Sequence, residues 1–203
     1  MIFIMSEETF ENTNKVTTSE RSFGEFINWR FSRKTPEKIQ IEISDQWNKL
    51  PEKASDYAVW VGHSTFLINN GDLTILTDPV FSKRASPVRI AGPKRLIPPA
   101  ISLKDLPQID VITVSHNHYD HLDIKSLKAL AKQNPKAIFL LPKGDKKLLS
   151  RSGIQNVEEF LWWEHIKIKK TSFTFTPVQH WSARGLRDRN KSLWGGWFIK
   201  SDL

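Results

Sequence analysis

The chain has 203 residues and carries a formal net charge of +8, from 30 Lys and Arg against 22 Asp and Glu. Hydrophobic residues make up 39% and charged residues 26%, which is typical of one globular domain and excludes a disordered chain. Cysteine is absent, which excludes disulfides and thiolate metal ligands, so any metal ion must be held by His, Asp or Glu.

The first 56 residues carry no recognisable catalytic motif. Residues 1–5 are apolar but too short for a signal sequence, and no apolar run could cross a bilayer, so we expect a cytoplasmic protein, with contact at the inner face of the membrane left open. Residues 1–22 are polar without periodicity, which predicts a mobile tail. Residues 23–56 contain aromatic residues that we expect to pack on the domain as an N-terminal strap, with a lipid contact as the alternative.

Three strands are expected over residues 57–61, 65–69 and 73–77, and each of the last two borders a hairpin signal at 69–72. His63 lies between the first two strands and could stand beside a site, although a structural histidine bonded to the backbone is an equal alternative. Asp78 follows the third strand and precedes Pro79. It could orient metal-binding histidines through a hydrogen bond, or it could simply form an Asp-Pro turn.

Residues 80–107 predict a long, proline-rich loop. It carries five cations, Lys83, Arg84, Arg89, Lys94 and Arg95. These side chains make the loop a candidate for binding an anionic head group, with Lys94 and Arg95 as the proposed substrate contacts. A solvated basic surface is the alternative, because a positive charge alone does not select among anionic partners.

The richest stretch of the sequence is residues 111–123, where an apolar, β-branched run predicts a buried strand that ends in a polar loop. That loop places His116, His118, Asp120 and His121 in the pattern His-x-His-x-Asp-His. Imidazole and carboxylate are the ligands that Zn²⁺ takes when thiolate is absent. Four ligands exceed what one tetrahedral ion can use from a short loop, so the spacing predicts two adjacent metals.

The rest of the chain continues as helices and strands. We expect helices over residues 124–132 and 144–152, and strands over residues 137–142, 157–160, 165–169, 172–177 and 193–199. His180 follows one of these strands and is a fifth candidate ligand. This order of strands, then β-α-β-α-β, then strands again indicates an α/β protein.

These residues resemble the metallo-β-lactamase fold superfamily and, more narrowly, the family of N-acyl phosphatidylethanolamine-hydrolysing phospholipase D and its bacterial relatives. The matching segments are residues 60–65, 76–81, 84–87, 91–95, 106–110, 115–123, 162–163, 176–181 and 193–197. The resemblance implies an αββα sandwich with a two-zinc site at one sheet edge. It implies that His116, His118 and His180 hold one zinc, and that Asp120 and His121 hold the other.

The resemblance also implies the reaction. Two Zn²⁺ would lower the pKa of a water molecule so that hydroxide attacks phosphorus, with Asp120 as both zinc ligand and orienter of the nucleophile. The expected products are a phosphatidic acid and an N-acylethanolamine. The implied partner is a small-molecule or phospholipid substrate, with no nucleic acid, and the sequence gives no oligomeric state.

One departure from the family concerns the end of the chain. The family continues into a Gly-Asp-Thr-Gly segment and a further histidine that complete the second metal site, whereas this chain ends at Leu203. We therefore expect residues 57–203 to form only the N-terminal part of the sandwich, and the activity of the chain alone to be impaired. The alternatives are another hydrolase on the same scaffold, such as a lactonase or nuclease, and a non-catalytic fragment.

Overall fold

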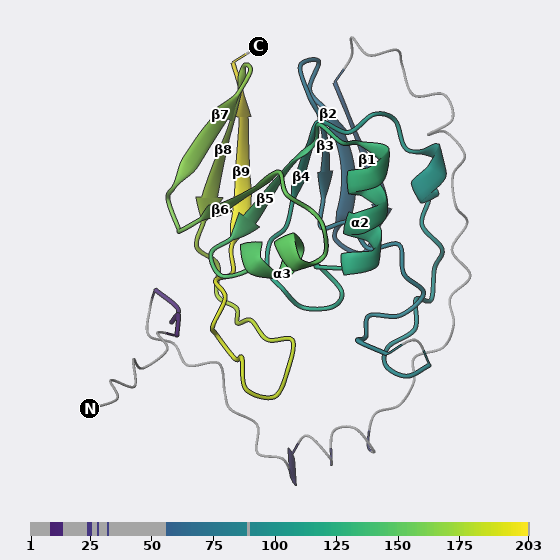
Figure 1. Cartoon of the computed structure of the whole chain (residues 1–203), viewed down its shortest axis with the longest axis vertical. Coiled ribbons are helices and arrows are strands. Elements are labelled where there is room, and N and C mark those ends of the chain that lie inside the picture. The colour runs from purple at the N-terminus through teal and green to yellow at the C-terminus, as the bar shows by residue number, and fades with distance from the viewer. Residues whose placement is uncertain are drawn as a thin grey trace.

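The structure is a computed structural model that describes residues 9–13, 24, 25, 28, 32, 56–88 and 90–202. Figure 1 shows two β-sheets side by side, with helices against the outer face of the larger one. The larger sheet contains, in spatial order, β1 (Tyr57–Gly62), β2 (Thr65–Asn69), β3 (Thr74–Thr77), β4 (Val111–Thr113), β5 (Ile138–Pro142) and β6 (Val157–Phe160). The smaller sheet contains β7 (His165–Ile168), β8 (Thr171–Thr176) and β9 (Gly196–Ser201). The helices are α2 (Ile124–Gln133), α3 (Lys146–Arg151) and the 3₁₀ turn η2 (Leu103–Asp105).

Strand direction determines where polar loops meet. The pairs β1–β2 and β2–β3 are antiparallel, whereas β3, β4, β5 and β6 pair in parallel. Parallel strands end at the same edge of a sheet, so the segments that follow β3 and β4 emerge side by side. The segment after β3 begins with Asp78, and Ser115 is the second residue after β4. The N–H of Asp78 donates to the carbonyl of Thr113, the last residue of β4, at 2.8 Å, which joins the two strand ends directly.

Each face of the larger sheet has its own apolar core. On one face, Leu127 and Leu130 of α2 are fully buried in the cluster that contains Ile112 and Phe139. The other face packs against the smaller sheet through a second cluster, whose members include Ile75, Val111, Leu140, Phe173 and Phe175. The described residues therefore form helix, sheet and sheet layers of the expected αββα sandwich, and the predicted fold class is confirmed.

The last strand begins later than its sequence predicts, at Gly196 rather than at residue 193. Leu193 and Trp194 instead precede the strand as buried residues. The indole N–H of Trp194 donates to the carbonyl of Val178 at 3.0 Å, so burial of this large ring and satisfaction of its N–H take precedence over the sheet ladder. Gly195 then approaches the other sheet, and its N–H donates to the carbonyl of Ser115 at 2.9 Å.

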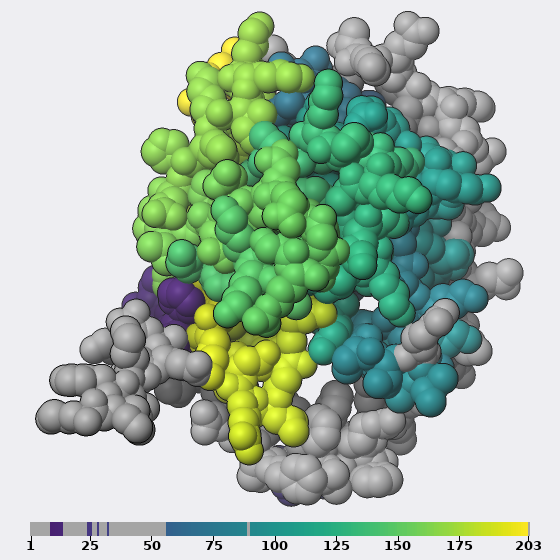
Figure 2. All heavy atoms as spheres, in the orientation of Figure 1, coloured from purple at the N-terminus to yellow at the C-terminus, as the bar shows by residue number. Residues whose placement is uncertain are grey.

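Residues 9–13 lie against the domain, where the sequence predicts a mobile tail. The N–H of Phe10 donates to the carbonyl of Asn190 at 2.8 Å, and its ring packs on the second core cluster. Figure 2 shows these residues in purple beside the yellow C-terminal part of the chain. Within these five residues, an aromatic ring and an asparagine have specific partners on the domain. The remainder of the tail and most of the strap lie outside the described residues, and Gly24, Glu25, Asn28 and Ser32 are helical.

The loop over residues 80–107 is shaped by backbone pairing. Arg84 and Lys94 form an antiparallel bridge, in which the N–H of Arg95 donates to the carbonyl of Lys83 at 2.8 Å. In the part of the chain that the structure describes, no helix is long and apolar enough to cross a membrane.

Gly195 tests how closely the segment just before β9 packs against the end of β8. A Cβ atom there would lie 2.5 Å from the Phe175 ring and 2.6 Å from the carbonyl oxygen of Thr176. We expect Gly195→Ala to lower the free energy of unfolding by about 1–3 kcal/mol in urea denaturation. Gly196→Ala is the matched control, because its nearest contact would be an ordinary 3.4 Å, and equal losses for the two variants would contradict the packing described here.

Candidate metal centre

Three histidines converge at the edge where β4 ends. Nε2 of His116 lies 2.9 Å from Nδ1 of His118 and 3.0 Å from Nε2 of His180. Nε2 of His180 lies 3.3 Å from Nδ1 of His118, which closes a triangle of nitrogens. The structure thus brings together two residues of the His-x-His-x-Asp-His loop and one that follows β8.

Hydrogen bonding among the rings alone cannot satisfy this triangle. Each imidazole nitrogen is either a donor or an acceptor, so no placement of protons makes all three pairs donor–acceptor pairs. A divalent cation removes the conflict, because all three nitrogens can then present lone pairs to it. Nitrogens bound tetrahedrally at a zinc–nitrogen distance of about 2.0–2.1 Å would lie about 3.3 Å apart, close to the spacings here. The residues present therefore fit a metal ion.

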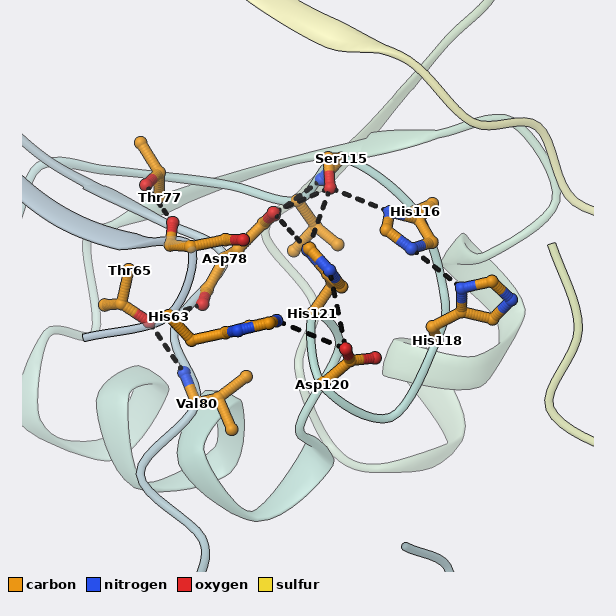
Figure 3. A network of polar contacts seen from close by, with 12 residues as sticks. His63, Thr65, Thr77, Asp78, Val80, Ser115, His116, His118, Asp120 and His121 are labelled. Carbon is orange, nitrogen blue, oxygen red and sulfur yellow. Dashed lines mark hydrogen bonds and ion pairs between the residues drawn. The ribbon is translucent and has the colours of Figure 1, made fainter. Parts of the chain in front are cut away.

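Asp78 fixes which nitrogens are free to act as ligands (Figure 3). Its Oδ2 lies 2.7 Å from Nδ1 of His121 and accepts from the hydroxyl of Ser115 at 2.6 Å, while its Oδ1 accepts from the N–H of Ser115 at 2.7 Å. The Ser115 hydroxyl, having donated to Asp78, can accept from Nδ1 of His116 at 2.9 Å. Both histidines are thereby held with Nδ1 protonated and with the Nε2 lone pair directed outward.

A second group of possible ligands lies beside the first. His63, Asp120 and His121 each offer an atom, and these three atoms lie within 4.8 Å of one another. Oδ2 of Asp120 lies 3.2 Å from Nε2 of His63 and 3.8 Å from Nε2 of His121. The two groups adjoin, because the ring centroids of His116 and His121 are 4.0 Å apart.

Burial and mutual repulsion determine the charge of the centre. Burial, followed by the neighbouring imidazoles, lowers the pKa of His116 to about 2, and burial together with His180 lowers the pKa of His118 to about 4. Burial also lowers the pKa of His180. For His121, burial acts to lower the pKa, but the hydrogen bond and charge of Asp78 outweigh it, so the pKa is raised. The three converging rings are consequently neutral near pH 7, as metal ligands must be.

Two supports of the ligand loop have no local signal in the sequence. The guanidinium of Arg184 donates to the carbonyls of Asn117 and Leu122 at 2.7 and 2.8 Å and lies over the Tyr119 ring at 4.1 Å. The carboxylate of Asp145 accepts from the side-chain amide of Asn117 at 3.2 Å, and burial raises the pKa of Asp145 to about 7 despite this bond and that of Ser192.

The two residues proposed to contact substrate differ in their surroundings. Arg95 is partly buried, and its guanidinium donates to the carbonyls of Val80 and Ser82, so it ties two parts of the loop together just after Asp78. Lys94 is exposed. Burial lowers the pKa of Arg95.

The comparison with protein families agrees with the fold. Residues 74–203 match the beta-lactamase superfamily domain, so the chain belongs to the metallo-β-lactamase superfamily. Within it, the chain is similar to N-acyl-phosphatidylethanolamine-hydrolyzing phospholipase D 1 of Caenorhabditis elegans, at 41% identity over 152 residues, covering 70% of this chain and 43% of that protein. It is also 41% identical over 148 residues to the mitochondrial enzyme of the same description from Saccharomyces cerevisiae, covering 70% of this chain and 31% of that protein. The chain thus spans less than half the length of these relatives.

Solved structures give the same fold. Igni18, a metallo hydrolase from Ignicoccus hospitalis, matches with a TM-score of 0.53 at 20% identity, covering 71% of this chain and 55% of that one. CmlA, a diiron β-hydroxylase from Streptomyces venezuelae, matches with a TM-score of 0.52 at 25% identity, covering 72% of this chain and 27% of that one.

The lowered pKa values predict a stability loss in acid for the chelator-treated protein. His116 and His118 stay neutral when folded, but in the unfolded chain they take up protons near pH 6.5. The unfolded state then binds more protons, so their contribution is fully present above about pH 6.5 and is lost as the pH falls toward the folded pKa values. We expect His116 alone to account for a loss of about 2 kcal/mol between pH 7 and pH 5, measured by urea unfolding. In His116→Ala/His118→Ala the loss should be smaller, and equal pH dependence in both proteins would refute neutral burial.

Asp78 gives a test of ligand orientation. Asp78→Ala removes the acceptor that holds Ser115 and His121, and we expect metal affinity to fall about 10–100-fold by competition with a chromogenic chelator. Asp72→Ala, which alters a carboxylate bonded instead to the N–H of Lys170, is the control. Unchanged affinity in Asp78→Ala would show that the carboxylate does not orient the ligands.

Proposed function

We propose that the protein is a metal-dependent hydrolase, and more specifically a phosphodiesterase that cleaves N-acyl phosphatidylethanolamine to a phosphatidic acid and an N-acylethanolamine. The observation that carries the proposal is the triangle of His116, His118 and His180 nitrogens beside the group of Asp120 and His121. The substrate class is supported by the two similar proteins described as phospholipases of this type.

The residues of the centre have distinct roles in this proposal. His116, His118 and His180 hold one cation, and Asp120 and His121 contribute to a second. A divalent cation held by these residues would lower the pKa of a bound water molecule and polarise a phosphoryl oxygen. Asp120 offers carboxylate oxygens beside both groups, where it orients the attacking water and accepts its proton. His63, at 3.2 Å from Asp120, fixes the rotamer of that carboxylate.

We propose zinc as the metal, with two ions in the complete centre. A donor set of imidazole and carboxylate without thiolate suits zinc and also suits iron. The second metal receives support from the similarity to CmlA, which is described as a diiron protein. Loading the protein separately with Zn²⁺ and with Fe²⁺, and assaying the activity of each form, shows which ion supports the reaction.

A phospholipid substrate is supported by the surface of the 80–107 loop. Ile90 and Leu96 are 89% and 78% exposed, and the same loop carries the exposed side chains of Lys83 and Lys94. Exposed apolar side chains interspersed with cations suit a surface that meets both acyl chains and phosphate. We propose that this loop touches the membrane in which the substrate lies, with Lys94 close to its phosphate.

The test is a single-turnover assay, with protein in excess over vesicles that contain N-acyl phosphatidylethanolamine, so that even a slow reaction is detected. We expect the metal-loaded protein to release N-acylethanolamine and phosphatidic acid, measured by mass spectrometry. Asp120→Asn should slow the reaction at least about 100-fold through loss of the proton acceptor. The double variant His116→Ala/His118→Ala gives the background rate of product release without the proposed metal centre.

The alternative hydrolases are separated in parallel. A chromogenic phosphodiester and a lactone are offered to the same metal-loaded protein, with and without chelator. Chelator-sensitive turnover of the lactone alone would replace the phosphodiesterase proposal with a lactonase, and no turnover above background with either metal would overturn the hydrolase proposal.

A further inference from the structure

We propose that Asn12 is a positioning residue of the metal centre. Through Asn12, residues 9–13 contribute to the geometry of the site. The side-chain amide of Asn12 holds the backbone of His180, so the N-terminal segment determines where the third imidazole stands. This inference rests on the proposed three-histidine metal centre but is independent of the substrate.

The contacts form a two-pronged clamp. The amide nitrogen of Asn12 donates to the carbonyl of His180 at 3.0 Å, and its amide oxygen accepts from the N–H of His180 at 3.0 Å. The two residues are 168 positions apart in the sequence. Asn12 thus pairs with His180 as a neighbouring strand would, although His180 lies in a loop after β8. A residue in a loop otherwise keeps more backbone freedom than one in a sheet ladder.

A third hydrogen bond fixes the orientation of the clamp. The indole N–H of Trp194 is shared between two acceptors, the same oxygen of Asn12 at 3.1 Å and the carbonyl of Val178 at 3.0 Å. An amide turned by 180° would set its NH₂ group against two N–H donors, so only one orientation is compatible with these partners. Because Trp194 is fully buried, the amide is anchored to the core while it holds His180.

The neighbours of Asn12 hold the segment on the same loop. The N–H of Phe10 donates to the carbonyl of Asn190, and Asn190 in turn donates its N–H to the carbonyl of Ser182, each at 2.8 Å. Phe10 therefore holds the loop that carries His180 at a second point, beside the pair of Asn12 and His180. Figure 2 shows this segment pressed against the yellow C-terminal part of the molecule.

The position of His180 matters because it supplies one corner of the nitrogen triangle. Its Nε2 must stay about 3 Å from both His116 and His118 for all three to reach one cation. A residue that only stapled the segment to the core would add to stability without affecting the metal. A positioning residue changes the affinity for the metal itself, since the free loop must be reordered on binding.

The test measures metal affinity and thermal stability in the full chain, using Zn²⁺ or Co²⁺ in competition with a chromogenic chelator. Asn12→Leu keeps the branching and the number of side-chain heavy atoms and removes all three hydrogen bonds, and we expect it to weaken binding about tenfold. Glu11→Ala, at an exposed neighbouring position, should bind like the wild type. Leu148→Ala, in α3, should lower the melting temperature without changing affinity, which separates stability from positioning.

The outcomes distinguish the inference from the proposal beneath it. A wild-type protein that binds no metal would overturn the proposed centre and the inference with it. A wild-type protein that binds, together with an Asn12→Leu variant of unchanged affinity, would overturn the inference alone, even if the melting temperature fell. If Asn12→Leu does not fold, Asn12→Ser, whose shorter side chain cannot span both backbone groups of His180, is measured in the same way and against the same expectation.

Discussion

The structure depends on one electrostatic constraint, the convergence of three neutral imidazole nitrogens whose hydrogen-bonding needs cannot all be met among themselves. His116, His118 and His180 meet in a partly buried place, where protonation is disfavoured by desolvation and by mutual repulsion. Such an arrangement costs free energy unless a cation occupies its centre. The surrounding residues hold the three imidazole rings in this arrangement through hydrogen bonds and packing.

The sheet supplies the frame for this constraint. Parallel pairing of β3 with β4 places Asp78 next to Ser115, and Asp78 then orients His121 directly and His116 through the Ser115 hydroxyl. The second sheet brings His180 from the other side of the sandwich, through a loop anchored by Trp194. The centre is therefore built where two sheets meet, and each sheet contributes ligands that the other cannot.

Much of this arrangement could be predicted from the sequence, because its signals are local. The spacing of His116, His118, Asp120 and His121 after an apolar strand predicts metal ligands at the end of that strand. Asp78, which precedes Pro79, marks the end of a second strand. The predicted start of β9 at residue 193 was wrong, because burial of Trp194 outweighs its β propensity. Asn12 and Arg184 could not be found, since their partners lie 168 and 67 residues away and only folding brings them together. The metal-ligand roles of His116, His118, Asp120, His121 and His180 are predictions that await a metal-binding measurement.

The most direct measurement is X-ray absorption spectroscopy at the metal edge of the protein carrying one equivalent of Zn²⁺. We expect a first shell of nitrogen and oxygen at about 2.0–2.1 Å, with the outer-shell scattering of about three imidazole rings. A shell of oxygen donors without imidazole scattering would contradict the convergence of His116, His118 and His180 on a single ion.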